Sequence, residues 1–358
     1  MNTFPDVTVI APCYNAAEYL SDCLDSLKAQ TIGLDHLQYI FIDDASTDAT
    51  LDILKDFEAS YPEQTLLISL EHNQGQGVAR NLALTYAAGT YVLFVDADDT
   101  IADYALELLF KYAQSSDSDV IEFDFVRQKQ AWISESEAGL ILPSAYEVTD
   151  TMSRQIFCTS VPRFGFIWNK FYRREFLVDN HIQNAERLVH EDTLFSQLVS
   201  LYTVHYLYIP VPLYFYRLNP SGTMLQAQSN DLRQFDRLKV QWQFLEECDK
   251  RGFLEKYYLA IETMFLRTYY MDTILFIIER FTEAPMEQLQ EMQFTVHTCF
   301  PDWQNNPFLF YQISSIEKLF LSTLNMKFNQ ESFQKLNFSL VIFSKIMDLS
   351  LIYEMLKY

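Results

Sequence analysis

The first third of the chain alternates short apolar segments with amphipathic ones. The apolar segments have the length and composition of strands, and the segments between them have the period of helices. This alternation predicts a largely parallel, right-handed α/β sheet in which a helix connects each strand to the next. The expected strands are Val7 to Ala11, Gln38 to Ile42, Thr65 to Leu70, Tyr91 to Val95 and Asp119 to Phe123, and the expected helices begin near Ala16, Asp48, Gly77 and Ile101.

Residues 126 to about 225 follow a mixed pattern. Prolines interrupt the last apolar segments of this region, and a proline cannot donate a hydrogen bond to a strand partner, so these segments are predicted to be separate short strands. The expected elements are a helix from Asp150, an aromatic stretch from Phe164 to Phe171, a helix from Glu191, and strands Val204 to Tyr208 and Leu213 to Tyr216, separated by Pro210 and Pro212.

Beyond Gln226 the apolar positions recur with a helical period. A stripe of Met and aromatic residues at this spacing is typical of a packed core. Because a chain of 358 residues exceeds the size at which single cores stop growing, about 250 to 300 residues, we expect two domains, 1–225 and a helical 226–358. The stripe consists of Ile261, Met264, Phe265, Met271, Ile274, Leu275 and Ile278.

Composition restricts the partners and the compartment. The formal net charge of −22 would repel nucleic acid and anionic lipid surfaces at long range. The five cysteines are scattered, without a CxxC pair, which indicates reduced thiols in a cytosolic protein. We expect no secretory signal and no transmembrane segment, because no window of about 20 residues is free of charge. The apolar stretch Leu340 to Leu356 predicts a packed helix, with membrane contact as the alternative.

Three carboxylates follow the most continuous apolar segment, Tyr91 to Val95. They are Asp96, Asp98 and Asp99. An uninterrupted apolar run is typical of a central strand covered on both faces, so the acids lie where that strand ends, which is the edge at which open α/β sheets bind ligands. Carboxylates this close repel one another, and the repulsion is relieved if a divalent cation and its phosphate ligands bind there.

Polar residues also follow the other early strands. The first strand leads into Pro12, Tyr14 and Asn15, where Asn15 on its own would be interpreted as a helix N-cap. The second ends in Asp43 and Asp44. The third is followed by a loop with two of the chain's eight glycines, which ends near Arg80. Because parallel strands present their carboxyl ends to one side, Tyr14, Asp44 and the three acids should converge on one crevice.

Together these segments resemble the family 2 glycosyltransferases, the inverting group with the GT-A fold. The segments that carry the resemblance are residues 9–15, 42–48, 73–81 and 94–99. It implies that Tyr14 packs against a nucleotide base, that Asp44 accepts a hydrogen bond from that base, and that Asp98 ligates Mn²⁺ or Mg²⁺. The implied nucleotide-binding set is Pro12, Tyr14, Asn15, Asp44, Asn73, Arg80 and Asp96, with Asp96 also near the metal.

The segment Leu188 to Phe195 resembles the Glu-Asp motif of the same family. By that resemblance Asp192 is the general base and Glu191 lies beside it in the acceptor site. Without the upstream motifs, both residues would be interpreted as first-turn acids that complement a helix dipole. The resemblance also implies that several residues, most of them in the aromatic stretch, contact the donor or acceptor sugar, and a buried aromatic core is the alternative for that stretch. It further implies that Arg217 contacts phosphate, in a segment with Ser221 to Met224 that closes the catalytic domain. The sugar-contact candidates are Asp99, Trp168, Asn169 and Lys170.

Two other functions compete with this hypothesis. Residues 94–100 also fit the apolar-DxDxT signature of haloacid dehalogenase-type phosphatases, with Asp96 as nucleophile and Asp98 as acid/base. That motif normally lies on the first strand of its domain, whereas three strand-helix units precede it here. A non-catalytic nucleotide-binding subunit with a GT-A fold is the other alternative, and the acids at Asp44, Asp96, Asp98 and Asp192 argue against it.

The resemblance therefore predicts a metal-dependent inverting transferase. The expected donor is a nucleotide sugar, most simply a UDP-sugar, and the expected acceptor is a glycan or a lipid-linked or protein-linked hydroxyl in bacterial cell-surface polysaccharide, teichoic acid or glycoconjugate synthesis. The protein is expected in the cytoplasm or peripherally at the inner face of the membrane. The helical C-terminal region is expected to serve the acceptor, a partner or homo-oligomerisation. The sequence does not select the donor sugar, because that choice rests on the placement of a few side chains.

Overall fold

The computed structural model describes residues 5–127, 132–160, 165–219, 232–310 and 313–327, with single residues 329, 331, 333, 334 and 336. The chain divides into two compact units. The first comprises Met1–Thr149 and Phe166–Gln226, and the second comprises Asp150–Gly165 and Ala227–Tyr358. The expected division at 225/226 assigned residues 150–165 to the first domain, whereas the structure groups them with the helical unit.

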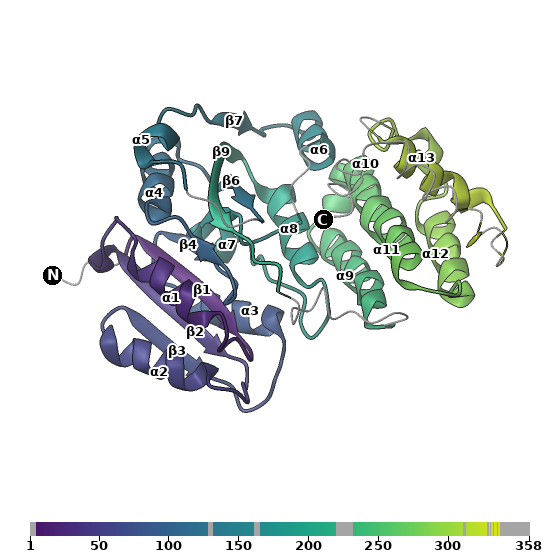
Figure 1. The fold of residues 1–358 in the computed structure, drawn as a ribbon. Coiled ribbons are helices and arrows are strands. Elements are labelled where there is room, and N and C mark those ends of the chain that lie inside the picture. The colour runs from purple at the N-terminus through teal and green to yellow at the C-terminus, as the bar shows by residue number, and fades with distance from the viewer. Residues whose placement is uncertain are drawn as a thin grey trace. The chain divides into compact units, whose positions relative to one another are not determined.

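The described part of the first unit is built on one nine-stranded sheet (Figure 1). Its strand order is β3-β2-β1-β4-β8-β6-β9-β5, and β7 pairs with β9. The strands are β1 (Val7–Cys13), β2 (Leu37–Asp43), β3 (Thr65–Ser69), β4 (Tyr91–Phe94), β5 (Thr100–Ile101), β6 (Val120–Val126), β7 (Ser144–Glu147), β8 (Lys170–Arg173) and β9 (His205–Phe215).

The four strands β3, β2, β1 and β4 are parallel, as the alternating pattern predicts. The sheet becomes mixed beyond them, because β8 is antiparallel to both β4 and β6. The expected fold class is confirmed, and the parallel order places the ends of β1, β2 and β4 at one edge of the sheet.

Helices cover both faces of the parallel part. Alternate residues of β1 and β2, such as Val9 and Tyr39, belong to one core with residues of α1, α2 and α4. The other helix of this part, α3, packs against β1 and β2. The helices of the first unit are α1 (Leu20–Lys28), α2 (Thr50–Ser60), α3 (Gln76–Tyr86), α4 (Ala105–Ser116), α5 (Glu135–Ala138), α7 (Arg174–Asp179) and α8 (Asp192–Tyr202).

Two predictions for this unit were wrong in detail. The helix expected from Ile101 begins at Ala105, because Thr100 and Ile101 pair with the distant strand β9. The two strands expected between residues 204 and 216 form one strand, β9. Its pairing with β6 shifts register around Asp124, which pairs with Pro212, so the strand continues past the proline through an irregular ladder.

The described part of the second unit is helical. Its helices are α6 (Thr151–Ser160), α9 (Asp236–Lys250), α10 (Phe253–Phe265), α11 (Thr273–Arg280), α12 (Met286–Cys299) and α13 (Ser315–Ser322), with a π-helix, Leu266–Asp272, between α10 and α11. The predicted apolar stripe is buried except for Leu275, which is half-buried. Tyr269 and Tyr270, in the π-helix, are fully buried as well, since a π turn changes which side chains face the core.

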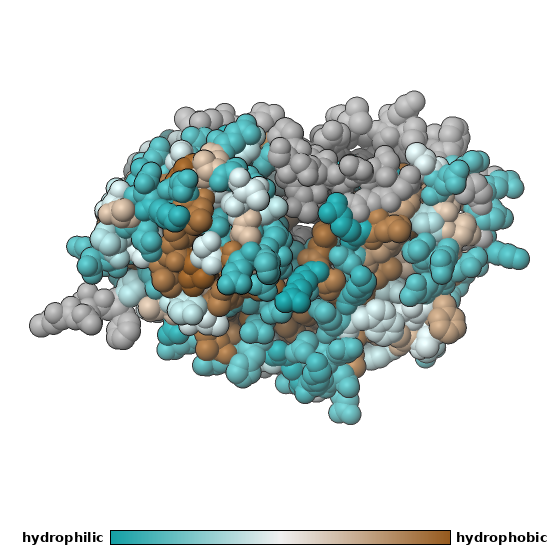
Figure 2. Space-filling model, turned by 90° about the horizontal axis from the view of Figure 1, so that it is seen from below, coloured by the Kyte–Doolittle hydropathy of each residue, from teal (hydrophilic) through white to brown (hydrophobic). Residues whose placement is uncertain are grey.

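Hydrophilic side chains cover much of the face seen in Figure 2, and brown hydrophobic areas are interspersed among them. Within the described ranges, no helix combines the length and the apolar character that a membrane span needs. The segments Ser221 to Met224 and Leu340 to Leu356, for which the sequence made predictions, lie outside the described residues.

Candidate active site

The end of β2 organises the loop that precedes α3. Asp44 is 3% exposed, and its two carboxylate oxygens accept hydrogen bonds from the backbone N–H groups of Gln74 (2.7 Å) and Gly75 (2.8 Å). Gly75 has φ +88°, a backbone conformation that residues with a side chain rarely adopt, so a glycine suits this position. Asp44 thereby fixes the start of α3 against the sheet edge.

The loop after β1 is fastened to the same edge. Asn15 adopts a left-handed conformation (φ 48°), and its Oδ1 accepts a hydrogen bond from the backbone N–H of Thr47 at 2.8 Å. Asn15 is therefore not an N-cap, since α1 begins only at Leu20. Tyr14 beside it is 51% exposed, which leaves its ring accessible. Of the other predicted nucleotide contacts, Asn73 is exposed and Pro12 is partly buried within β1.

The three acids after β4 have different environments. Asp96 Oδ1 accepts a hydrogen bond from Arg80 at 2.7 Å, and Asp98 Oδ2 accepts one from Asn219 Nδ2 at 2.8 Å. Burial, and then the charge of Asp96, raises the pKa of Asp98. The carboxylate of Asp98 therefore lies where added positive charge would stabilise its ionised form.

Asp99 is fully buried and connects the acidic loop to the end of β9. Its two oxygens accept hydrogen bonds from the Tyr214 hydroxyl and from the Arg217 backbone N–H, both at 2.7 Å. The Tyr214 oxygen in turn accepts a hydrogen bond from the Asp96 backbone N–H at 3.1 Å. Burial raises the pKa of Asp99. Because its side chain is enclosed by these partners, the geometry argues for a positioning role and against direct sugar contact.

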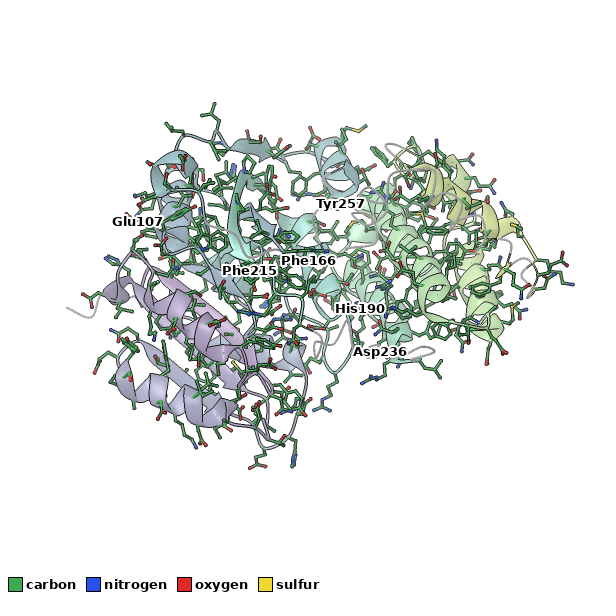
Figure 3. All side chains as sticks on the ribbon, viewed as in Figure 1. Glu107, Phe166, His190, Phe215, Asp236 and Tyr257 are labelled. Atoms are coloured by element: carbon green, nitrogen blue, oxygen red, sulfur yellow. The ribbon has the colours of Figure 1, made fainter. Side chains whose placement is uncertain are left out.

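Arg217 contacts this loop with its side chain as well. Its Nε donates to the Asp98 carbonyl at 2.8 Å, and its Nη2 forms an ion pair with Asp22 at 2.7 Å. Phe215, labelled in Figure 3, marks the end of β9 just before this arginine. The guanidinium of Arg217 therefore connects the acidic loop to α1.

Arg80 joins the two acidic motifs. Its side chain is 3% exposed, and its guanidinium contacts Asp96 Oδ1 and Glu191 Oε1, each at 2.7 Å. An arginine that donates to two carboxylates at once fixes their relative position. The contact of Arg80 with Glu191, which is 111 residues away in the sequence, was not predicted.

The segment that carries Glu191 lies very close to α3. An added Cβ at Gly77 would be 2.2 Å from the Ala185 carbonyl oxygen and 3.0 Å from Glu191 Cγ. The segment leads through His190, labelled in Figure 3, into α8. Gly77 therefore permits an approach that no other residue would allow, and this approach brings Glu191 within reach of Arg80.

Asp192 is the first residue of α8, with Glu191 at the N-cap position. Both acids thus occupy the helix start that the helix-dipole interpretation predicts, but Glu191 is also paired with Arg80. Burial, and then the charge of Glu191, raises the pKa of Asp192, and the charge of Arg80 partly opposes this. A carboxylate with a raised pKa is a suitable proton acceptor near neutral pH.

The proposed sugar contacts in the aromatic stretch are buried. Trp168 is 4% exposed and stacks on Phe166 and Tyr214, with ring centroids 4.7 and 4.6 Å away. Lys170 is 1% exposed, and its ammonium donates to the Phe166 carbonyl and to Asn169 Oδ1. This structure favours the alternative of a packed core, with Lys170 buried rather than at the surface. Trp168 supports Tyr214 and, through it, the acidic loop.

The acidic residues fit a metal ion that is held partly by the substrate. Within the described ranges, no group of three or more His, Cys, Asp or Glu side chains is arranged to hold a metal by itself. Mg²⁺ is usually bound by one or two carboxylates together with substrate phosphates. Asp98, partly buried and with a raised pKa, offers hard oxygen ligands suited to that mode, beside Asp96.

Sequence reasoning did not find Gly77, Asn81, Tyr214 or Asn219 as site residues. Gly77 carried a signal, because it is one of only eight glycines. The roles of Tyr214 and Asn219 depend on where β9 ends relative to β4, and nothing in their local sequence indicates it.

Comparisons with known proteins agree with this geometry. Residues 8–178 match the family model described as glycosyl transferase family 2. The uncharacterized glycosyltransferase YibD of Escherichia coli (strain K12) is 30% identical over 261 residues, which are 72% of this chain and 74% of YibD. The chain therefore belongs to glycosyl transferase family 2, and it is a glycosyltransferase. This assignment replaces the phosphatase hypothesis.

A second relative has solved structures. The poly(ribitol-phosphate) beta-N-acetylglucosaminyltransferase TarS of Staphylococcus aureus (strain Mu50) is 34% identical over 197 residues, which are 54% of this chain but only 32% of TarS. The structure of TarS 1–349 in complex with UDP superposes with a TM-score of 0.57 at 20% identity, over 90% of this chain and 94% of that one. This likeness shows that the two share the GT-A fold.

Proposed function

We propose that this protein is a metal-dependent, inverting glycosyltransferase that moves a sugar from a UDP-sugar to an acceptor hydroxyl. The observation that carries the proposal is the double ion pair of Arg80 with Asp96 and Glu191. This ion pair connects Asp96, which is expected near the donor diphosphate, to the segment that carries the expected base, Asp192. A donor and an acceptor bound on either side of Arg80 would therefore have their reacting atoms close together.

The donor side is formed by Tyr14, Asp44 and the acidic loop. The exposed ring of Tyr14 is available to a nucleotide base. Asp44 uses its oxygens to order the loop before α3, and each carboxylate oxygen has capacity for a further hydrogen bond, so it can also accept one from a uracil N–H. TarS, the relative described above, has been solved in complexes with UDP and with UDP-GlcNAc, which supports UDP as the nucleotide.

Asp98, with Asp96 beside it, would hold Mn²⁺ or Mg²⁺ together with the diphosphate. When bound, the cation would stabilise the negative charge that develops on the departing nucleoside diphosphate. Arg80 would keep Asp96 oriented toward the ribose and phosphates, and Asp99 would keep the loop in place through its contacts with the end of β9.

Asp192 would remove the proton from the acceptor hydroxyl as that oxygen attacks the anomeric carbon. Attack on the face opposite the leaving diphosphate inverts the anomeric configuration. Glu191 would lie beside the base, paired with Arg80, and burial together with the charge of Glu191 raises the pKa of Asp192.

For the acceptor we propose a hydroxyl of a bacterial cell-surface glycan, such as a teichoic acid. The support is the name of TarS, which describes a transfer to poly(ribitol-phosphate). We propose that the reaction takes place in the cytoplasm, because the five cysteines are scattered along the chain without a CxxC pair, as is typical of reduced thiols. The second unit is proposed to bind the acceptor or a second copy of the chain.

The test begins with a panel of nucleotide sugars in Mn²⁺, read by thermal shift, since a ligand that binds the native state raises the melting temperature. UDP-sugars should give the largest shift. Release of UDP from the best donor should then be lost in Asp98→Ala and fall to a small residual rate in Asp192→Asn, with UDP binding retained in the latter. Phosphate release from phosphomonoesters without turnover of any nucleotide sugar would refute the proposal, as would a wild-type rate in Asp192→Asn.

A further inference from the structure

Asn81 of α3 makes a two-sided hydrogen-bonded pair with the backbone of Asn184. Asn81 Oδ1 accepts from the Asn184 backbone N–H at 2.8 Å, and Asn81 Nδ2 donates to the Asn184 carbonyl at 3.0 Å. The Asn184 side chain adds a third bond, from its Nδ2 to Asn81 Oδ1 at 3.2 Å. Asn81 and Asn184 are 8% and 4% exposed, so water does not replace these bonds easily.

The pair lies at the beginning of the segment that carries the acidic motif. The next residue, Ala185, donates its backbone N–H to the Glu191 carbonyl at 3.1 Å, so residues 185 and 191 close a loop. Two non-glycine residues inside this loop, Arg187 (φ 58°) and His190 (φ 67°), have positive φ values. Such conformations are unfavourable for side-chain-bearing residues and persist when the surroundings hold them. The pair with Asn81 is one such restraint, at the base of the loop.

We infer that Asn81 is a positioning residue, which acts through the loop to place Asp192 for proton transfer. The inference rests on the proposed role of Asp192 as the base. The Asn81 amide offers an acceptor and a donor on two separate atoms, which match the backbone N–H and C=O of Asn184. Aspartate lacks the donor and alanine lacks both groups, so the identity of the residue matters and not only its volume.

The experiment compares Asn81→Ala with the matched control Asn184→Ala. The control removes the third bond but retains the backbone N–H and C=O that Asn81 binds. For each variant, kcat is measured as the rate of UDP release with water as the acceptor. The donor is whichever of UDP-glucose, UDP-galactose, UDP-GlcNAc and UDP-GalNAc the wild type hydrolyses fastest. UDP affinity and melting temperature are measured in parallel.

We expect Asn81→Ala to lower kcat on the order of 100-fold, since misplacing a catalytic group by 1 Å has about that effect, while UDP affinity changes by about threefold or less. Asn184→Ala should keep kcat within about threefold of the wild type. In an Asp192→Asn background Asn81→Ala should have no further effect, because the group it positions is gone.

Other outcomes overturn the inference in distinguishable ways. If Asn81→Ala keeps the wild-type kcat while Asp192→Asn falls to its residual rate, Asn81 does not position the base, and the proposed function stands. If Asn81→Ala adds its full effect to Asp192→Asn, its role is independent of Asp192. If Asp192→Asn has the wild-type rate, the proposed base itself is wrong. Should Asn81→Ala not fold, Asn81→Asp, which keeps the volume and the acceptor, must show the same loss of kcat.

Discussion

Replacing Gly77 by alanine tests whether close packing between α3 and the 185–191 segment is required for activity. The new Cβ would lie 2.2 Å from the Ala185 carbonyl oxygen, which is backbone and not a movable side-chain tip. Carbon–oxygen contacts in proteins are rarely shorter than about 3.3 Å, so the segment must move by about 1 Å. Because Glu191 Cγ lies 3.0 Å from the same point, the movement also displaces the carboxylate that Arg80 holds.

Two effects on stability oppose each other. Alanine is favoured over glycine within a helix by up to about 1 kcal/mol, and overpacking costs about 1–3 kcal/mol. The net loss is therefore at most about 3 kcal/mol, which leaves a protein of ordinary stability largely folded. Displacing the base by 1 Å, in contrast, should lower the rate on the order of 100-fold. Gly77→Ala should accordingly be a folded protein with low activity.

The measurement is kcat for UDP release, with the melting temperature recorded alongside. Gly139→Ala is the matched control, because Gly139 lies in the same unit, its backbone φ is −68°, and an added Cβ would have no neighbour closer than 3.4 Å. The control should retain the wild-type rate. A Gly77→Ala protein with the wild-type rate and an unchanged or higher melting temperature would show that the segment moves aside without consequence, and the reasoning would fail.

Three further predictions follow from the site. The rate of the wild type should fall with decreasing pH around a midpoint above the usual pKa of an aspartate, about 4, because burial and the charge of Glu191 raise the pKa of Asp192. Arg80→Gln should move that midpoint higher, because the charge of Arg80 lowers the pKa of Asp192. A midpoint near 4 in both proteins would contradict the assignment. Asp98→Ala should abolish the extra thermal shift that Mn²⁺ adds to UDP, and an undiminished Mn²⁺ effect would remove Asp98 from the metal site. Tyr214→Phe, which keeps the stack on Trp168 but loses the hydroxyl between Asp96 and Asp99, should lower UDP affinity about tenfold, as titration calorimetry would show.

The sequence predicted the parallel part of the sheet and the edge at which its strands end, because both depend on local patterns. Apolar runs of strand length defined β1 to β4 within a few residues, and the rule that parallel strands end at one edge placed Asp44 and Asp96 on the same side. These inferences need no knowledge of which residues meet across long separations.

The remaining features depend on such long-range contacts. The two-residue strand β5 exists because it pairs with β9, more than 110 residues later in the chain. The burial of Trp168 and Lys170 likewise depends on β9 and on the strands beside β8, so an aromatic segment with a lysine was equally consistent with a sugar-binding surface. Asp99 was a candidate for sugar contact, and its enclosed position depends on two distant partners, Tyr214 and Arg217.

The charge of the site itself provides an argument for a cation. The site, as described above, contains five acidic residues and two arginines. The acids are Asp96, Asp98, Asp99, Glu191 and Asp192, and the arginines are Arg80 and Arg217. The raised pKa values of Asp98, Asp99 and Asp192 are consistent with this excess of negative charge, with burial as the largest cause in each. A diphosphate that entered the site would add further negative charge. A cation would offset this charge without protonating Asp192, which supports the proposed role of Asp98 and Asp96 in holding Mn²⁺ or Mg²⁺.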